Sequence, residues 1–346
     1  MNDQTDSHKA RPLNPHEDGP PNSHEDDPPN YHEAGPPSNP PVNEKEFPPD
    51  YYSSANPEHG WDFIVCNSGF LNGLNVFVSS EAVGKYKSFK DNSNVGLSSH
   101  INDLQAQGLG VPLFHCETHS FSMNKFLTIT RYHTNNAALK GFNRKTDFTP
   151  FCKITKHHHR SYYTYILTFT PNPNNPNENF KVWMFSHRSL PIREYEYKGI
   201  RYRWIHEKKY LSYLESYRAF RLEPNQPAML DNWTGGDTLN SQSNPLVGNK
   251  FSHLKPSSRM PKEEYYSGND VGKFDELKKH SLFGRLQEAT RILLPDVSNT
   301  GNSDVNYDSI HSVHLDVLVH LCMGLIIKRH EDIQEDNRAA AAAAAS

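Results

Sequence analysis

Residues 315–327, LDVLVHLCMGLII, decide the fold of this protein. Apolar side chains occupy every side of the helix that this stretch predicts, and Asp316 and His320 interrupt them. A helix that is apolar all round is buried either in a protein core or in a bilayer. The stretch rises only about 20 Å, too little for a hydrocarbon core of about 30 Å, and an acid and a histidine are costly in lipid. We therefore expect the rest of the chain to enclose this helix.

Residues 193–206, REYEYKGIRYRWIH, predict a β-hairpin. A two-residue turn at Lys198-Gly199 suits the positive φ that glycine allows. It places Tyr195 opposite Tyr202 on one face and Glu194 opposite Arg203 on the other. Aromatic and opposite-charge pairs across two strands contribute roughly 0.2–1 kcal/mol each. The charges of this hairpin are therefore interpreted as structural.

Several other segments alternate at period 2 or are short apolar runs, both of which are typical of strands. They are 62–66, 74–78, 113–116, 126–132, 161–170, 180–185 and 289–294. Between them, 79–111 is polar and predicts a loop with one small helix near 101–107. Many strands and one apolar helix favour a mainly β fold, in which a closed antiparallel barrel surrounds the C-terminal helix and has no free edge.

Composition divides the chain into parts. Residues 1–57 contain 13 of the 25 prolines, a net charge of −8 and three copies of an eight-residue repeat that begin at His16, His24 and His32. Such a segment cannot bury enough apolar surface to offset its ordering entropy, so it predicts a disordered arm. Residues 58–330 form the barrel domain with a net charge of +7, from 32 basic and 25 acidic residues. We expect a disordered insertion at about 224–280, rich in Asn, Ser and Gly, and a polar, Ala-rich tail at 331–346.

Several classes of protein are disfavoured. The first 50 residues contain no apolar segment of the kind that marks a secretory signal, and no apolar stretch is long enough for a transmembrane span. The four widely spaced cysteines include no CxxC pair, which favours a reducing, cytoplasmic environment. No GxxxxGK[ST], HExxH or GxSxG motif occurs. His115, Cys116 and His119 make only half of a zinc site. The sequence therefore predicts no catalytic residue, metal or cofactor, and no nucleic-acid partner.

These features resemble the tubby-like superfamily, which includes the tubby C-terminal domain, the phospholipid scramblases and the LURP-one proteins. The strand-rich body that ends in the apolar helix 317–327 carries the resemblance. The hairpin 195–204, YEYKGIRYRW, is similar to an aromatic-Gly-basic-Trp hairpin of fungal members. The resemblance implies a closed antiparallel barrel threaded by its last helix, membrane association, and phosphoinositide binding in the tubby branch. The calcium-binding and palmitoylation motifs of the scramblases are not evident, and the basic residues of the tubby branch match no positions here.

One basic cluster is the candidate lipid-binding site. It consists of Lys153, Lys156, His157, His158, His159 and Arg160. Consecutive strand residues point to opposite faces, so the three histidines cannot share one metal. As a basic loop the cluster could meet anionic phospholipid headgroups; as an ordinary hairpin tip it would only be solvated.

The leading hypothesis is a non-enzymatic lipid- or protein-interaction module, cytoplasmic and peripheral to a membrane. One alternative is an adaptor whose arm, 1–57, recruits a Pro-motif-binding protein. Another is an enzyme with a pocket at the mouth of the barrel.

Overall fold

The computed structural model describes residues 60–67, 73–91, 98–119, 125–132, 147–207, 214–240, 244, 246–247, 269–277, 286–296 and 305–345. The predicted arm, 1–57, lies outside this part of the chain.

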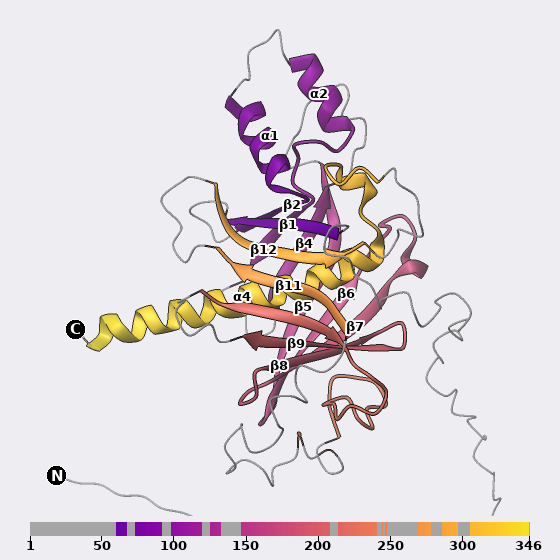
Figure 1. Ribbon diagram of the computed structural model, residues 1–346, viewed down its shortest axis with the longest axis vertical. Coiled ribbons are helices and arrows are strands. Elements are labelled where there is room, and N and C mark those ends of the chain that lie inside the picture. The colour runs from indigo at the N-terminus through magenta and orange to yellow at the C-terminus, as the bar shows by residue number, and fades with distance from the viewer. Residues whose placement is uncertain are drawn as a thin grey trace, which may run out of the picture. The chain divides into compact units, whose positions relative to one another are not determined.

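Twelve strands of the described chain form a closed antiparallel barrel, as expected for a mainly β protein (Figure 1). Each strand pairs with its neighbours in sequence, and β1 pairs with β12, so the sheet has no free edge. The strands are β1 (Gly60–Asn67), β2 (Gly73–Phe77), β3 (Phe114–Thr118), β4 (Lys125–Tyr132), β5 (Phe148–His158), β6 (Tyr162–Phe169), β7 (Phe180–His187), β8 (Ile192–Tyr197), β9 (Ile200–Glu207), β10 (Ser216–Arg221), β11 (Asn269–Glu276) and β12 (Gln287–Pro295).

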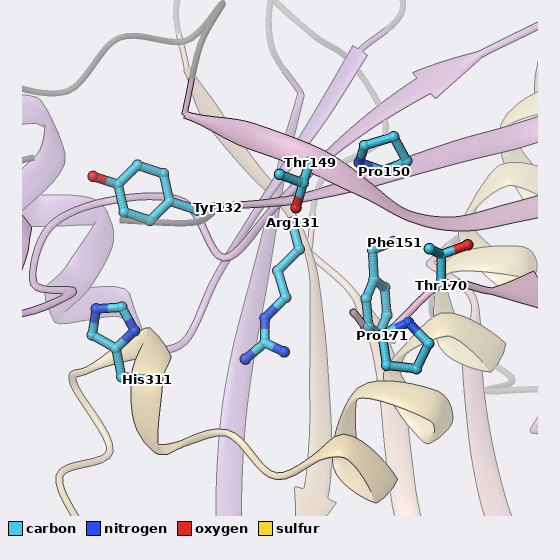
Figure 2. A pocket seen from close by; sticks show the side chains of 8 residues that line it. All are labelled: Arg131, Tyr132, Thr149, Pro150, Phe151, Thr170, Pro171 and His311. Carbon is cyan, nitrogen blue, oxygen red and sulfur yellow. The ribbon is translucent and has the colours of Figure 1, made fainter. Parts of the chain in front are cut away.

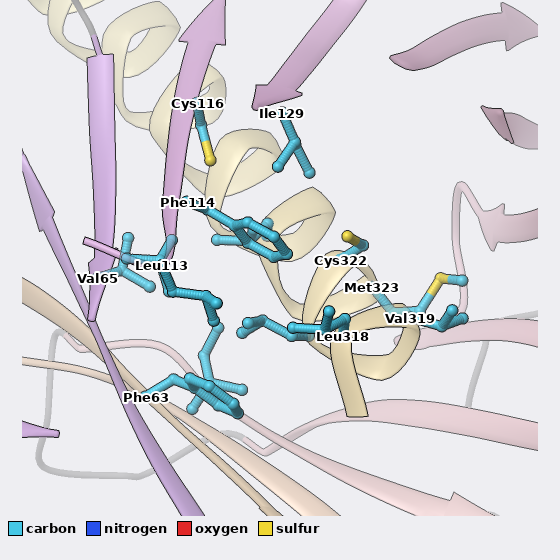
Figure 3. Packing of buried hydrophobic residues seen from close by; sticks show 14 of the residues in the cluster. Phe63, Val65, Leu113, Phe114, Cys116, Ile129, Leu318, Val319, Cys322 and Met323 are labelled. Carbon is cyan, nitrogen blue, oxygen red and sulfur yellow. The ribbon is translucent and has the colours of Figure 1, made fainter. Parts of the chain in front are cut away.

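Helix α4 (Leu315–Ala345) runs through the ring of strands, which confirms the prediction from its apolar stretch (Figure 1). Every side chain from Val317 to Met323 except His320 is at most 1% exposed. Figure 3 shows Leu318 and Cys322 of α4 in one apolar cluster with Phe114 of β3 and Phe63 of β1. Burial of each large apolar side chain stabilises the fold by roughly 1.5–3 kcal/mol, so the helix and the inner face of the barrel stabilise each other.

The β8–β9 hairpin has the predicted register. Tyr195 lies opposite Tyr202, and Glu194 lies opposite Arg203. Lys198 has φ of 52° and Gly199 has φ of 74°, as in a type I′ turn. Lys198 Nζ also lies 2.9 Å from Asp316 Oδ2, in the first turn of α4. The hairpin tip thereby holds the end of the barrel at which the helix enters, and the carboxylate suits a helix N-terminus.

Two helices precede β3, and only α2 (Ser98–Ala106) was predicted. Helix α1 (Ser80–Asp91) lies in the segment expected to be a loop. The Ser79 hydroxyl accepts a hydrogen bond of 3.1 Å from the Ala82 amide, which is an N-cap contact. Ala82 and Val83 are buried in the main core. This cap is the local signal that could have revealed α1.

The prediction of a disordered insertion at 224–280 is wrong for the part of it that the structure describes. Residues 269–276 form β11, in which Val271 and Phe274 are buried. Met229, Leu230 and Leu239 join a second apolar cluster on the outer face of the barrel, with Phe185 and Ile205 beneath them. We call residues 227–239 the covering segment. A few well-placed apolar side chains hold it against the barrel, so composition alone was misleading.

The C-terminal region also differs from expectation. Asp308 and Ser309 precede a short 3₁₀ turn, η7 (Ile310–Ser312), and α4 begins at Leu315, the first residue of the predicted apolar stretch. The predicted tail, 331–346, continues α4 as far as Ala345. Alanine has the highest helix propensity, and no Gly or Pro interrupts the segment.

Candidate functional site

Where helix α4 leaves the barrel, its apolar residues are followed by buried polar and charged ones. After Ile327 come Lys328, Arg329 and His330, which are only 2%, 4% and 8% exposed. Buried charges need partners, and Lys328 forms an ion pair with Asp332 one turn later. These three residues lie in the middle of α4, at the rim of the barrel.

His330 is held in a neutral form at this rim. Its Nδ1 lies 3.0 Å from the hydroxyl oxygen of Tyr165 on β6, and its Nε2 lies 2.9 Å from Nε2 of Gln334. An amide nitrogen only donates, so Nε2 of the ring accepts, and we assign the ring proton to Nδ1. Burial, followed by the charges of Arg193 and Lys156, lowers the pKa of His330 to about 3.

Arg193 lies at the same rim of the barrel and contacts α4 from another strand. This β8 residue is buried, and its Nη2 lies 3.1 Å from Glu331 Oε1 of α4. Its guanidinium also lies 4.7 Å from the ring centre of Tyr217 on β10, whose hydroxyl donates to the same Glu331 oxygen. Glu331 therefore compensates Arg193, which is not available to an outside anion.

Lys156 and Arg188 differ from Arg193, because both lie against the same aromatic ring and not beside a described carboxylate. Lys156 Nζ is 4.1 Å from the ring centre of Tyr163, and the Arg188 guanidinium carbon is 5.1 Å from it. Cation–π contacts of this kind are worth about 0.5–1 kcal/mol at exposed sites. Within the described chain, neither cation forms an ion pair with a carboxylate. Burial, followed by the charges of Arg193 and Arg188, lowers the pKa of Lys156 to about 8.

The structure divides the predicted lipid-binding cluster between two faces. The β5–β6 register runs without a break from Cys152 to His158. Because Ile154 is buried inside the barrel, Lys156 and His158 face inward at its rim, and Lys153 and His157 face outward. Only Lys156 and His158 therefore lie on the face that carries Tyr163, and the His158 ring makes an edge contact with Tyr163 at 5.1 Å.

The other members of that cluster have local roles. His157 Nδ1 lies 3.1 Å from Asp237 Oδ2, in the covering segment. The His159 ring stacks on Tyr162 at 4.4 Å. Arg160 is exposed in the turn that follows β5, and its carbonyl oxygen accepts a hydrogen bond of 3.4 Å from Arg188 Nη1. These contacts make the hairpin tip an ordered structure rather than a loose loop.

Sequence reasoning missed Arg188, the position of Tyr163 between two cations, and His330. The signals were present in part, since Tyr163 and Tyr165 alternate on one face of a predicted strand. Pairing that strand with residues 152–158 would have placed Lys156 beside them. Arg188 lies just beyond the end of β7 and is brought in only by the β6–β7 pairing. We call Lys156, His158, Tyr163 and Arg188 the rim cluster.

Other chemistry finds little support in the described residues. No group of three or more His, Cys, Asp or Glu side chains in them is arranged to hold a metal. All four cysteines are buried free thiols, and burial raises the pKa of the Cys66 thiol to about 12. The half zinc site does not converge, because His115 contacts Asn75 and His119 contacts Thr128.

The sequence profile of a protein family described as DIA1 matches residues 58–336. The chain belongs to the DIA1 family. The match begins just before β1 and ends after α4 has left the barrel, so it covers the whole barrel, its inner helix and the rim cluster. Comparisons with curated proteins and with solved structures find no match. Among the described helices, none combines the length and the apolar character that a membrane crossing requires.

Proposed function

We propose that this DIA1 protein is a non-enzymatic module that binds anionic phospholipid headgroups at a membrane surface, on the cytoplasmic side. One observation carries the proposal. Lys156 and Arg188 flank the ring of Tyr163 at 4.1 and 5.1 Å, and no carboxylate of the described chain compensates them. Basic residues near an anionic surface contribute about 1 kcal/mol each, and tyrosine suits the boundary between headgroups and acyl chains.

The arrangement favours a lipid headgroup over a dissolved anion as the ligand. Arg188 and Arg160 are exposed, whereas Lys156 is half-buried against Phe126, Tyr163 and Tyr165. A headgroup phosphate can reach Lys156 from outside while the exposed arginines contact neighbouring lipids. The free thiols of the four cysteines support a reducing environment for this surface.

We also propose that the DIA1 family is a branch of the tubby-like superfamily. A closed antiparallel barrel around a C-terminal helix is the architecture that the resemblance implies, and it supports the relationship. A sequence profile built from DIA1 proteins should align 193–206 and 315–327 with the corresponding hairpin and helix of tubby-like proteins. Alignment of these segments with other elements would contradict the proposal.

Vesicle flotation with the full chain tests the binding function. We expect weak binding to phosphatidylcholine alone and stronger, salt-sensitive binding when phosphatidylserine or a phosphoinositide is added. Lys156→Gln and Arg188→Gln should each weaken binding about fivefold. Lys153→Gln, which removes the same charge from the outer face of β5, is the matched control. Equal losses in Lys153→Gln and Lys156→Gln would show that net charge rather than the rim cluster is responsible, and binding without dependence on anionic lipid would end the proposal.

A further inference from the structure

A cavity of about 200 Å³ lies at the other end of the barrel, where α4 enters. Four separate segments line it: the end of β4, the start of β5, the residues after β6, and η7 (Figure 2). The lining residues are Arg131, Tyr132, Thr149, Pro150, Phe151, Thr170, Pro171 and His311. Because these segments are far apart in sequence, only closure of the barrel creates the cavity.

Arg131 occupies a position that continues the core. Ile129 and Arg131 are alternate residues of β4, and they lie opposite Cys116 and Phe114 of β3 in an unbroken register. Ile129, Cys116 and Phe114 are all fully buried inside the barrel, so the Arg131 side chain also points inward. Figure 2 shows its guanidinium directed into the space between His311 and Phe151. A cation therefore stands where the pattern of the strand calls for an apolar residue.

No protein group neutralises this cation in the described chain. Arg131 forms no ion pair with a described carboxylate. Its guanidinium carbon makes a cation–π contact with the Phe151 ring, 5.9 Å from the ring centre. Burial alone lowers the pKa of Arg131. A half-buried guanidinium without a counter-ion is costly, whereas a bound anion would both compensate its charge and satisfy its donors.

Aromatic and proline side chains form one part of the wall around Arg131. Phe151 lies at a β-bulge, because Ile129 pairs with Cys152 and Thr130 with Pro150. The bulge turns Phe151 inward beside Cys152, and its ring contacts Phe114 at 5.1 Å and Phe169 at 5.7 Å. Bulges of this kind often re-aim a side chain next to a binding site. The prolines at 150 and 171 add rigid apolar surface, and the two threonines add hydroxyl groups.

We propose that this cavity binds a small organic anion, whose carboxylate or phosphate group pairs with the Arg131 guanidinium and whose planar apolar body lies against Phe151 and Pro171. Arginine matches both anionic groups through its planar fork of donors. The volume is below the 300–1,000 Å³ or so of sites for drug-sized ligands, so a compound with a single ring suits it better than a lipid. The site lies at the end of the barrel opposite the rim cluster and does not depend on the proposed membrane function.

Titration calorimetry with the full chain tests the proposal, with benzoate, phenyl phosphate, inorganic phosphate and the uncharged benzamide as probes. We expect benzoate or phenyl phosphate to bind at millimolar or lower concentration. Whichever of the two binds more tightly identifies the anionic group. Inorganic phosphate, which lacks the apolar body, and benzamide, which lacks the charge, should each bind roughly tenfold or more weakly.

Variants show whether Arg131 carries the binding. Arg131→Gln should weaken it roughly tenfold or more, and Arg131→Lys, which keeps the charge but loses the fork, should weaken it less. Arg338→Gln, at an exposed position of α4, is the matched loss of charge and should have no effect. A thermal melt of each variant shows whether it is folded, so that loss of binding can be separated from misfolding. Absence of binding by both aromatic anions, equal binding of benzamide, equal binding of inorganic phosphate, or full binding by a folded Arg131→Gln chain would each overturn the proposal.

Discussion

Glu194 and Arg203 form an ion pair that is completely shielded from solvent, since both side chains are 0% exposed. Arg203 Nε and Nη2 lie 2.9 and 2.8 Å from Glu194 Oε1. The covering segment completes the pair: the Met229 amide donates to Glu194 Oε2 at 2.7 Å, and Arg203 Nη2 donates to the Pro227 carbonyl at 2.5 Å. A cross-strand pair that would be half-solvated on an open sheet is therefore sealed by residues from another part of the chain.

Breaking the Glu194–Arg203 ion pair should strongly destabilise the fold. Glu194→Gln leaves the Arg203 charge buried without a counter-charge, and we expect a loss of about 3–5 kcal/mol in the free energy of unfolding, measured by urea denaturation. Glu196→Gln breaks the neighbouring Glu196–Arg201 pair, which is about one-third exposed, and should lose less than about 1 kcal/mol. A double change, Glu194→Leu with Arg203→Met, should recover much of the loss. Equal effects of the two single changes would mean that the covering segment does not seal the pair in solution.

Two buried histidines make the stability of the fold sensitive to acid. Burial lowers the pKa of His320 to about 4 and that of His330 to about 3. In the unfolded chain each takes up a proton near the ordinary value of 6.5, so between these values the unfolded state binds more protons and stability falls as the pH falls. For His320 the loss by pH 4 should approach about 3 kcal/mol.

Urea denaturation at several pH values checks this dependence. His320→Gln removes the titrating group, although it also disturbs the contact of 2.6 Å with the Tyr195 hydroxyl, so its stability should be lower near pH 7 but change less between pH 7 and 4. His100→Gln, at an exposed position on α2, should retain the dependence of the unaltered chain. A parallel pH profile for His320→Gln and the unaltered chain would contradict the assignment.

Gly324 lets β12 approach the inner helix closely. A Cβ atom at this position would lie 2.9 Å from Ile292 Cδ1 and 3.3 Å from Ile292 Cγ2. Gly324→Ala gains up to about 1 kcal/mol of helix propensity, but overpacking a core costs about 1–3 kcal/mol. We expect a net fall in the melting temperature, which Ile292→Val should reverse because it removes Cδ1.

Gly84 in α1 provides the control for this substitution. A Cβ atom there meets nothing within 4 Å, so Gly84→Ala should stabilise the chain by up to about 1 kcal/mol. If Gly324→Ala were as stabilising as Gly84→Ala, the helix would lie farther from β12 than in this structure.

The proposed headgroup site should lose affinity at alkaline pH. Lys156 has a pKa lowered to about 8, so it is charged below that value and neutral above it. Binding to anionic vesicles should therefore weaken about fivefold as the pH rises through 8, well before an ordinary lysine titrates. A bound phosphate stabilises the charged form and moves this midpoint upward. Flotation from pH 7 to pH 10 should show the fall for the unaltered chain and for Lys153→Gln, and a nearly flat profile for Lys156→Gln. A fall that persists in Lys156→Gln would assign the titration to another group.

Local periodicity determined much of the architecture. The alternation in 193–206 predicts both the strands and their register, because strand side chains repeat every two residues. The all-round apolar character of 315–327 predicts an enclosed helix, because only a core can accept it. These are properties of neighbouring residues, so they are visible in one sequence. The covering segment and β11 were missed because their few apolar residues are buried only by contact with strands that are distant in the sequence.

What the chain contacts at a distance was decided only by the tertiary structure. The sequence determined a closed antiparallel barrel around its last helix, and it placed a basic cluster at 153–160. Closure of the ring then separated that cluster onto two faces, joined Lys156 to Arg188 across Tyr163, and aimed Arg131 into a cavity at the other end. The physical reason is that the inward or outward direction of a strand residue follows from local alternation, whereas its neighbours across the barrel depend on how every strand pairs in turn.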